Sequence, residues 1–274
     1  MLGSVAVALP LLVGVAGTPQ PSWSATAAGN AVSAANPAPQ VYSLALPRRT
    51  GRPTSSPAGG QPTPPPAGSL PPVDCRKAKC VALTFDDGPV RQTGHVLDVL
   101  RSRGARATFF VLGVQASNRA GLLRRMVADG DAVGNHSWNH PKFFKMSAKA
   151  IRSQLARTER VITAAIGAHQ RLVRTPFGQQ DARIRKLVAQ AGAPVILWNV
   201  DPQDWKYRNT KTVVHKVVKA VRRNSIVLIH DIRPTTRAGV AQLVERLQAK
   251  GYVLVTVPEL LGGSIKPGKV YLHG

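Results

Sequence analysis

Two adjacent carboxylates, Asp86 and Asp87, follow an apolar run at residues 80–83 and precede the turn-forming pair Gly88-Pro89. Side chains alternate along a strand and the chain turns beyond its end, so the two acids can point differently and take different roles near one site. Two imidazoles, His136 and His140, lie four residues apart and converge on one ion if their segment makes a helical turn. One carboxylate and two imidazoles form a common catalytic zinc set.

The elements that must position these groups alternate along the chain. Short apolar runs predict strands at residues 80–85, 107–112, 132–135, 171–174, 195–200, 226–229 and 252–257. Segments with spaced apolar residues predict helices at residues 94–103, 119–128, 147–166, 182–191, 212–222 and 238–249. This alternation predicts an α/β fold with a parallel sheet, namely a distorted, TIM-like (β/α)7 barrel.

Polar residues fall at the carboxyl ends of several of these expected strands. They are Asp86, Asp87, His136, Arg174, Asp201 and His230. βα barrels build their active sites at this rim. The placement therefore supports both the barrel and a site on it.

The first part of the chain differs from the rest. Residues 5–16 form an uncharged apolar run, followed by small residues at 24–27, which predicts a secretory signal at 1–28. A basic n-region is missing, so the signal is atypical or the start codon lies upstream; the run is too short for a comfortable transmembrane helix. Residues 29–72, rich in Pro, Ala, Gly and Ser, predict either a semi-rigid spacer or a disordered leader. A folded domain at 73–262 and a tail at 263–274 complete the expected organisation.

The charge balance is strongly basic. The formal net charge is +24; residues 1–72 contain three arginines, Arg48, Arg49 and Arg52, and no acid, so +21 belongs to residues 73–274. Such a field concentrates a protein on a polyanion, and with an export signal we expect an anionic cell wall. A G+C-rich genome, which favours Arg codons, is an alternative source of part of this excess. The sequence shows no zinc finger, helix-turn-helix or basic stripe interleaved with aromatics, so we expect no nucleic-acid binding.

Two cysteines, Cys75 and Cys80, are separated by four residues. In an exported protein they predict a disulfide, which would stabilise the entry to the first strand by roughly 2 kcal/mol on the chain-entropy model. In the cytosol they would remain free thiols. No stable protein partner is indicated, and we expect a monomer.

Five motifs occur together in the folded part: TFDDGP at 84–89, HSWNH at 136–140, RTPF at 174–177, DPQDW at 201–205 and LIH at 228–230. In this order they resemble the polysaccharide deacetylases, also called the NodB-homology or carbohydrate esterase 4 family, over residues 81–261. Any single motif is weak evidence. The resemblance implies the same distorted barrel and a catalytic role for residues 73–262.

The resemblance implies that Asp87, His136 and His140 are metal ligands, with Zn²⁺ as the best fit and Co²⁺ as an alternative. It implies that Asp86 is the general base and that Arg174 orients it. Phe177 stands where the family usually has tyrosine, and its backbone N–H would serve the oxyanion. Thr175 replaces the commoner proline, with a consequence that the sequence does not reveal.

The same resemblance assigns the leaving-group side of the site. His230 is the expected general acid, and Asp204 is expected to hold it protonated near neutral pH. Trp205 and Leu228 are expected to wall a pocket for the acetyl methyl group. Plain core packing is the ordinary explanation for either of these apolar residues alone.

We therefore expect a secreted or cell-envelope, metal-dependent deacetylase whose polysaccharide substrate is peptidoglycan N-acetylglucosamine. Alternatives are a chitin-oligosaccharide deacetylase or an acetylxylan esterase, which use the same machinery. A second class is a non-catalytic wall-binding protein that kept the fold, although a binder has no need of both Asp86 and His230.

Overall fold

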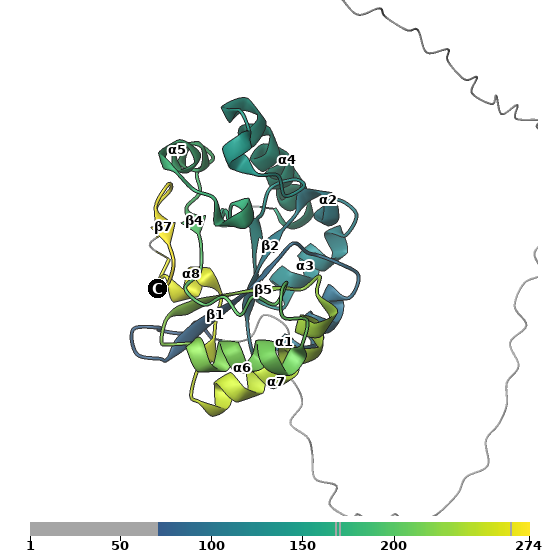
Figure 1. The fold of residues 1–274 in the computed structure, drawn as a ribbon, viewed down its shortest axis with the longest axis vertical. Coiled ribbons are helices and arrows are strands. Elements are labelled where there is room, and N and C mark those ends of the chain that lie inside the picture. The colour runs from purple at the N-terminus through teal and green to yellow at the C-terminus, as the bar shows by residue number, and fades with distance from the viewer. Residues whose placement is uncertain (1–70, 168, 170, 264) are drawn as a thin grey trace, which may run out of the picture. The chain divides into compact units, whose positions relative to one another are not determined.

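The computed structural model describes residues 71–274 except 168, 170 and 264 (Figure 1). The expected signal at 1–28, and the expected linker at 29–72 apart from its last two residues, lie outside this part. Within it, no helix is both long and apolar enough to cross a membrane.

A parallel sheet forms the centre of the described part. Its strands run in the order β3-β2-β1-β5, with β6 also paired to β1, and a separate parallel pair joins β4 to β7. The bounds are β1 (Cys80–Asp86), β2 (Ala107–Val111), β3 (Ala132–Asn135), β4 (Val195–Ile196), β5 (Ser225–His230), β6 (Val253–Leu254) and β7 (Val270–Tyr271). The register sets Asp86 level with Phe110 on one side and with His230 on the other.

Three isolated parallel bridges extend this pairing into a ring. They join Asn135 to Val173, Val173 to Val195, and Val200 to Val227. The strand pairing therefore runs from β3 through residue 173 to β4. The chain continues from β4 to residue 200, which pairs with β5, and β5 pairs with β1. This closed but irregular ring agrees with the expected α/β class and distorted barrel.

The helices cover the outside of this ring. In Figure 1, α6 and α7 lie side by side on one side of the sheet, and α4 and α5 lie at the opposite end. The bounds are α1 (Thr93–Ser102), α2 (Gly113–Ala116), α3 (Ala120–Ala128), α4 (Ala148–Ile166), α5 (Ala182–Gln190), α6 (Thr210–Ala220), α7 (Pro234–Ala249) and α8 (Val257–Leu260), with 3₁₀ turns η1 (Phe143–Lys145) and η2 (Pro176–Gly178). Ser147, Asp181 and Asn209 cap α4, α5 and α6 by accepting backbone N–H bonds.

Several expected strands are shorter than predicted or absent. The segment 171–174 makes only the bridges of Val173, and β4 ends at Ile196. The guanidinium of Arg174 donates to the carbonyls of Ile196 and Leu197, both at 3.0 Å, so these acceptors serve a side chain instead of a neighbouring strand. The expected strand at 252–257 keeps two residues, because Thr256 caps α8 in a capping box with Glu259.

The ends of the described domain are tied to the barrel. A disulfide joins Cys75 to Cys80, the first residue of β1. Residues 263–274, expected as a tail, include β7, which pairs with β4. Between these ends the core is apolar, and inside it the rings of Phe85 and Phe109 stack with centroids 5.0 Å apart.

Candidate metal and active site at the carboxyl ends of the strands

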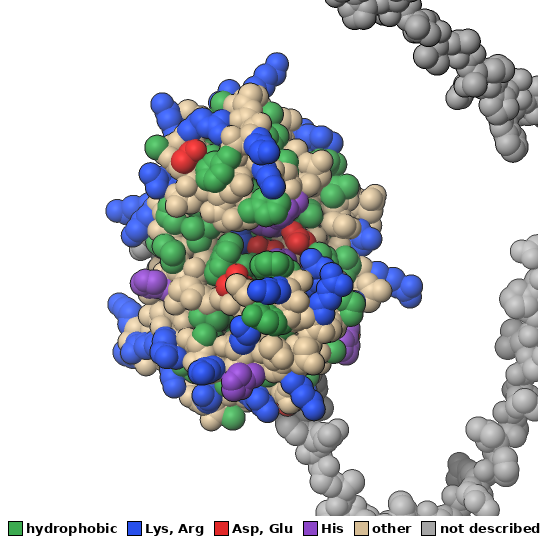
Figure 2. Space-filling view, viewed as in Figure 1, with side chains coloured by type: hydrophobic (Ala, Val, Ile, Leu, Met, Phe, Trp, Pro, Cys, Tyr) green, Lys and Arg blue, Asp and Glu red, His purple; other side chains and the backbone are tan. Residues whose placement is uncertain are grey.

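A cavity of about 540 Å³ opens at the carboxyl ends of the barrel strands. Figure 2 shows acidic and histidine side chains inside a hollow that hydrophobic side chains surround. The cavity is lined by Asp86, Asp87, His136, His140, Phe177, Gly178, Trp198, Asp201, Trp205, Leu228, His230 and Arg233. Of the expected site residues, only Arg174 and Asp204 do not line it; both are fully buried and contact residues that do.

Asp87, His136 and His140 form a group that can hold a metal. One ligand atom from each lies within 4.8 Å of the others. The Asp87 Oδ1 atom is 3.6 Å from His136 Nε2 and 3.7 Å from His140 Nε2. This buried oxygen accepts no hydrogen bond from any residue that the structure describes. An orphaned carboxylate oxygen facing two imidazoles fits a tetrahedral ion with an open fourth position.

The protonation of His136 suits a ligand. Its Nδ1–H donates to the carbonyl of Arg174 at 2.7 Å, which leaves the Nε2 lone pair facing Asp87 and His140. Burial lowers the pKa of His136 to about 3, although the charge of Asp87 opposes the shift. The imidazole is therefore neutral, as metal ligation requires.

The two imidazoles converge as expected, but not through a helical turn. Residues 136–140 have no helical structure; Ser137 and His140 instead have left-handed backbones, with φ of 74° and 61°. Ser137 Oγ accepts a hydrogen bond from His140 N at 3.1 Å. Gln154 Oε1, on α4, accepts from Trp138 N at 2.8 Å and from Asn139 N at 3.2 Å.

Asp86 is held by Arg174 on the other side of the acid pair. Arg174 Nη1 donates to Asp86 Oδ1 at 2.8 Å and to Thr84 Oγ1 at 2.7 Å, and the guanidinium lies 4.1 Å from the centroid of the Phe110 ring. Burial raises the pKa of Asp86, while the positive charge of Arg174 opposes this. The arrangement fixes the carboxylate, leaving its Oδ2 3.5 Å from His136 Nε2.

His230 and Asp204 form the opposite wall. The His230 Nδ1–H donates to Asp204 Oδ1 at 2.7 Å, and Asp204 Oδ2 accepts from His230 N at 2.9 Å and from Thr236 Oγ1 at 2.6 Å. Burial alone would lower the pKa of His230, but the hydrogen bond and charge of Asp204 outweigh it and raise the pKa to about 9. His230 is therefore protonated at neutral pH.

Apolar groups complete the cavity. Phe177 has φ of 58°, and its ring centroid lies 4.4 Å from that of His140. Its backbone N–H makes no hydrogen bond within the described part of the chain. Trp205 is half exposed and Leu228 is buried, and both line the cavity.

Some lining residues carry no role in the sequence analysis. Asp201 falls at the expected rim, and its Oδ1 accepts from Gln203 N at 2.7 Å. Trp198 lies three residues before it. Arg233 belongs to none of the five motifs, and its only signal is its position three residues after His230.

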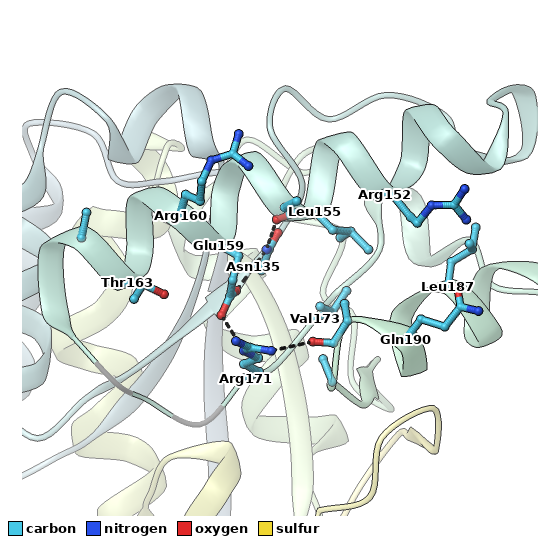
Figure 3. A pocket seen from close by; sticks show the side chains of 14 residues that line it. Asn135, Arg152, Leu155, Glu159, Arg160, Thr163, Arg171, Val173, Leu187 and Gln190 are labelled. Carbon is cyan, nitrogen blue, oxygen red and sulfur yellow. Dashed lines mark hydrogen bonds and ion pairs between the residues drawn. The ribbon is translucent and has the colours of Figure 1, made fainter.

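A larger cavity, about 820 Å³, lies between α4 and α5 and contains none of the expected site residues (Figure 3). Its wall is mainly aliphatic, and its central charges are paired with each other. Arg171 Nε lies 3.2 Å from Glu159 Oε1, and Arg171 Nη1 donates to the Ala191 carbonyl at 3.2 Å. This cavity brings no reactive groups together and is not the candidate site.

Comparison with known proteins finds relatives of this chain. Residues 74–196 match the family model of polysaccharide deacetylases. The peptidoglycan-N-acetylglucosamine deacetylase PgdA of Listeria monocytogenes is 39% identical over 194 residues, covering 70% of this chain and 41% of that protein. The chain thus spans about two fifths of that relative. The chitooligosaccharide deacetylase of Sinorhizobium fredii is 35% identical over 197 residues, covering 66% of this chain and 92% of that protein.

A solved structure of a related protein has a similar fold. The peptidoglycan deacetylase PdaC of Bacillus subtilis superposes with a TM-score of 0.66 at 40% identity, covering 69% of this chain and 93% of that structure.

Proposed function

The chain belongs to the polysaccharide deacetylase family, and on that premise we propose that it removes acetyl groups from the amino sugars of peptidoglycan, N-acetylglucosamine first among them. One observation carries the proposal. A candidate metal triad, a buried carboxylate held by an arginine, and a protonated histidine face one cavity. These are the groups that hydrolysis of an unactivated amide requires.

Each residue has a role in this reaction. A zinc ion held by Asp87, His136 and His140 would supply Lewis-acid chemistry to water and to the acetyl carbonyl. Asp86 accepts the proton of the attacking water, and Arg174 keeps its carboxylate aimed at that water. The unpartnered N–H of Phe177 donates to the developing oxyanion. Trp205 and Leu228 exclude water around the acetyl methyl group.

His230 completes the proton balance. As the C–N bond breaks, the amine nitrogen needs a proton, because an amine anion is a very poor leaving group. Protonated His230 donates it, and Asp204 stabilises the imidazolium beforehand. The products are acetate and a free amino sugar.

The names of the relatives and the charge of the chain support the proposed substrate and place of action. The names of relatives include both peptidoglycan and chitooligosaccharide deacetylases, so chitin oligosaccharides are the first alternative and acetyl esters of xylan the second. The basic charge and the signal-like N-terminus support an extracytoplasmic enzyme at an anionic wall. We propose a monomer, zinc as the resident metal with cobalt as the alternative, and residues 73–262 as the catalytic domain.

Acetate release from purified peptidoglycan and from chitin oligosaccharides tests the proposal. We expect release that a chelator abolishes and zinc restores. Asp86→Asn should lower the rate by about 10²–10⁴ while retaining zinc, whereas Asp87→Asn should lose zinc affinity as well. Zinc content and near-UV circular dichroism control for folding. No acetate from either polymer by folded, zinc-loaded protein would favour the non-catalytic wall-binding protein.

A further inference from the structure

Arg233 places a positive charge in the wall of the catalytic cavity. The residue is half-buried, and its Nε is buried without a hydrogen-bond partner among the described residues. Its guanidinium also makes no ion pair within the part of the chain that the structure describes. Unpaired buried donors cost stability, so a residue of this kind at a ligand cavity points to a partner on the ligand.

The acids that line the cavity or lie directly behind its wall are already engaged elsewhere. Asp86 pairs with Arg174 at 2.8 Å, and Asp204 pairs with His230 at 2.7 Å. Asp87 faces the two imidazoles of the metal group. Asp201, the remaining lining acid, accepts from the backbone of Gln203 and lies beyond ion-pair distance of Arg233. The positive charge of Arg233 therefore remains available to a ligand.

The backbone fixes where this charge enters the cavity. Arg233 N donates to the carbonyl of His230 at 3.2 Å, and Pro234 begins α7 directly afterwards. Arg233 O in turn accepts from Arg237 N at 3.0 Å. The guanidinium is thus tethered to the turn that carries the expected proton donor. An anion bound to it would belong to the sugar being deacetylated or to its immediate neighbour.

We propose that Arg233 is a specificity-determining residue that binds a carboxylate on the saccharide, as in an amino sugar bearing a lactyl ether acid. This inference rests on the proposed deacetylase function and deepens it. A cavity of about 540 Å³ holds more than an acetamido group, so it has room for a sugar and such a substituent. A guanidinium binds a carboxylate through charge-assisted hydrogen bonds, in a bidentate manner where the geometry allows.

The test compares two matched substrates. One is a tetrasaccharide of alternating N-acetylglucosamine and N-acetylmuramic acid with free lactyl carboxylates, and the other is its N-methylamide. We expect the wild-type chain to have the higher kcat/KM for the acid. Arg233→Gln should reduce the acid-to-amide ratio by about tenfold or more, the effect of one charge-assisted hydrogen bond. Arg233→Lys should retain part of the preference.

A control variant distinguishes the effect of the charge at Arg233 from the effect of the positive charge of the surface as a whole. Arg208→Gln removes the same charge from an exposed residue outside the cavity and should leave the ratio unchanged. Circular dichroism establishes that each variant is folded. An acid-to-amide ratio that is the same in the wild type and in Arg233→Gln overturns the inference. It is also overturned if Arg233→Gln changes nothing except the inhibition by acetate, because Arg233 would then bind the product.

Failure of the proposed function gives a different result. If the wild type releases no acetate from either tetrasaccharide or from chitin oligosaccharides, the deacetylase proposal fails. Calorimetric Kd values of the zinc-loaded protein for the acid and the amide then still test Arg233. Tighter binding of the acid that Arg233→Gln abolishes would support the inference, and equal Kd values would overturn it.

Discussion

Two imidazoles in one cavity are held in opposite protonation states by their neighbours. Burial lowers the pKa of His136 to about 3, and the charge of Asp87 and the hydrogen bond to the Arg174 carbonyl oppose this shift without outweighing it. His230 donates to the carboxylate of Asp204, so its pKa rises to about 9 despite burial. A ligand must be neutral and a general acid must be protonated. Burial sets the first state, and the carboxylate of Asp204 sets the second.

Asp204→Asn should move the alkaline limb of the pH–rate profile to lower pH. A raised histidine pKa means that the proton is held until the pH exceeds that value, so activity should fall as the pH rises through about 9. Without the carboxylate, the pKa of His230 falls and the limb should shift by about 1–3 units. Asp201→Asn is the matched comparison and should shift the limb less, because Asp201 acts on His230 through its charge alone, without a hydrogen bond. If the alkaline limb lies at the same pH in Asp204→Asn and in the wild type, Asp204 does not raise the pKa of the general acid.

At the scale of elements, the segment between β3 and η1 carries two candidate ligands yet has no regular structure of its own. Neighbouring elements hold it instead. The first N–H groups of α2, at Gly113 and Val114, donate to the carbonyls of Ser137 and Trp138, both at 3.0 Å. From α4, Gln154 binds two successive N–H groups of the segment and donates to Asn139 Oδ1 at 2.8 Å. Gln154, which lies outside all five motifs, therefore holds the backbone between the two histidines.

Gln154→Ala should weaken zinc binding by about tenfold, since supporting residues around metal ligands typically contribute 10–100-fold. Competition with a chromogenic chelator measures the zinc Kd directly, independently of activity. Arg152→Ala, at an exposed position of the same helix, is the matched control. Thermal melting of the zinc-free proteins shows whether the fold itself has changed. Unchanged zinc affinity in Gln154→Ala would mean that α2 alone is sufficient to hold the segment.

The elements also show what sequence can predict. Strand β1 and helix α4 have long apolar patterns, so their positions were predicted within one residue at each end. The strand predicted at 171–174 does not form as a regular strand, because the side chain of Arg174 donates to the carbonyls of Ile196 and Leu197, which a neighbouring strand would otherwise use. Strand β7 has only two residues and pairs with β4 far away in sequence. The histidine segment turns through non-glycine residues with positive φ, which composition does not reveal.

Motif position was a better guide at the cavity. All ten expected catalytic, substrate-binding and metal-ligating residues lie in its wall or directly behind it, because motifs at strand ends converge on one rim. Arg233 and Gln154 were missed for a physical reason. Gln154 acts through a tertiary contact, and Arg233 is proposed to act on a ligand; no spacing rule predicts either.

At the scale of the whole molecule, the net charge of +24 arises from 37 basic and only 13 acidic residues. At least three of those acids, Asp86, Asp87 and Asp204, are turned into the catalytic cavity or its wall. Figure 2 accordingly shows Lys and Arg side chains around the periphery of this face and few exposed acids. This face is therefore more uniformly positive than the composition alone implies.

This distribution predicts that association with an anionic wall is salt-dependent while chemistry on a neutral oligosaccharide is not. Raising the ionic strength from 0.1 to 1 M shortens the Debye length from about 10 Å to about 3 Å, which screens the surface field but not the buried pairs Arg174–Asp86 and His230–Asp204. Co-sedimentation with cell-wall fragments carrying anionic polymers should fall steeply over this range, whereas sedimentation with chitin and kcat/KM on chitin oligosaccharides should change little. An equal salt dependence for both polymers would show that the basic surface does not select the wall. Stronger retention on DNA than on wall fragments at equal charge density would instead favour the nucleic-acid class.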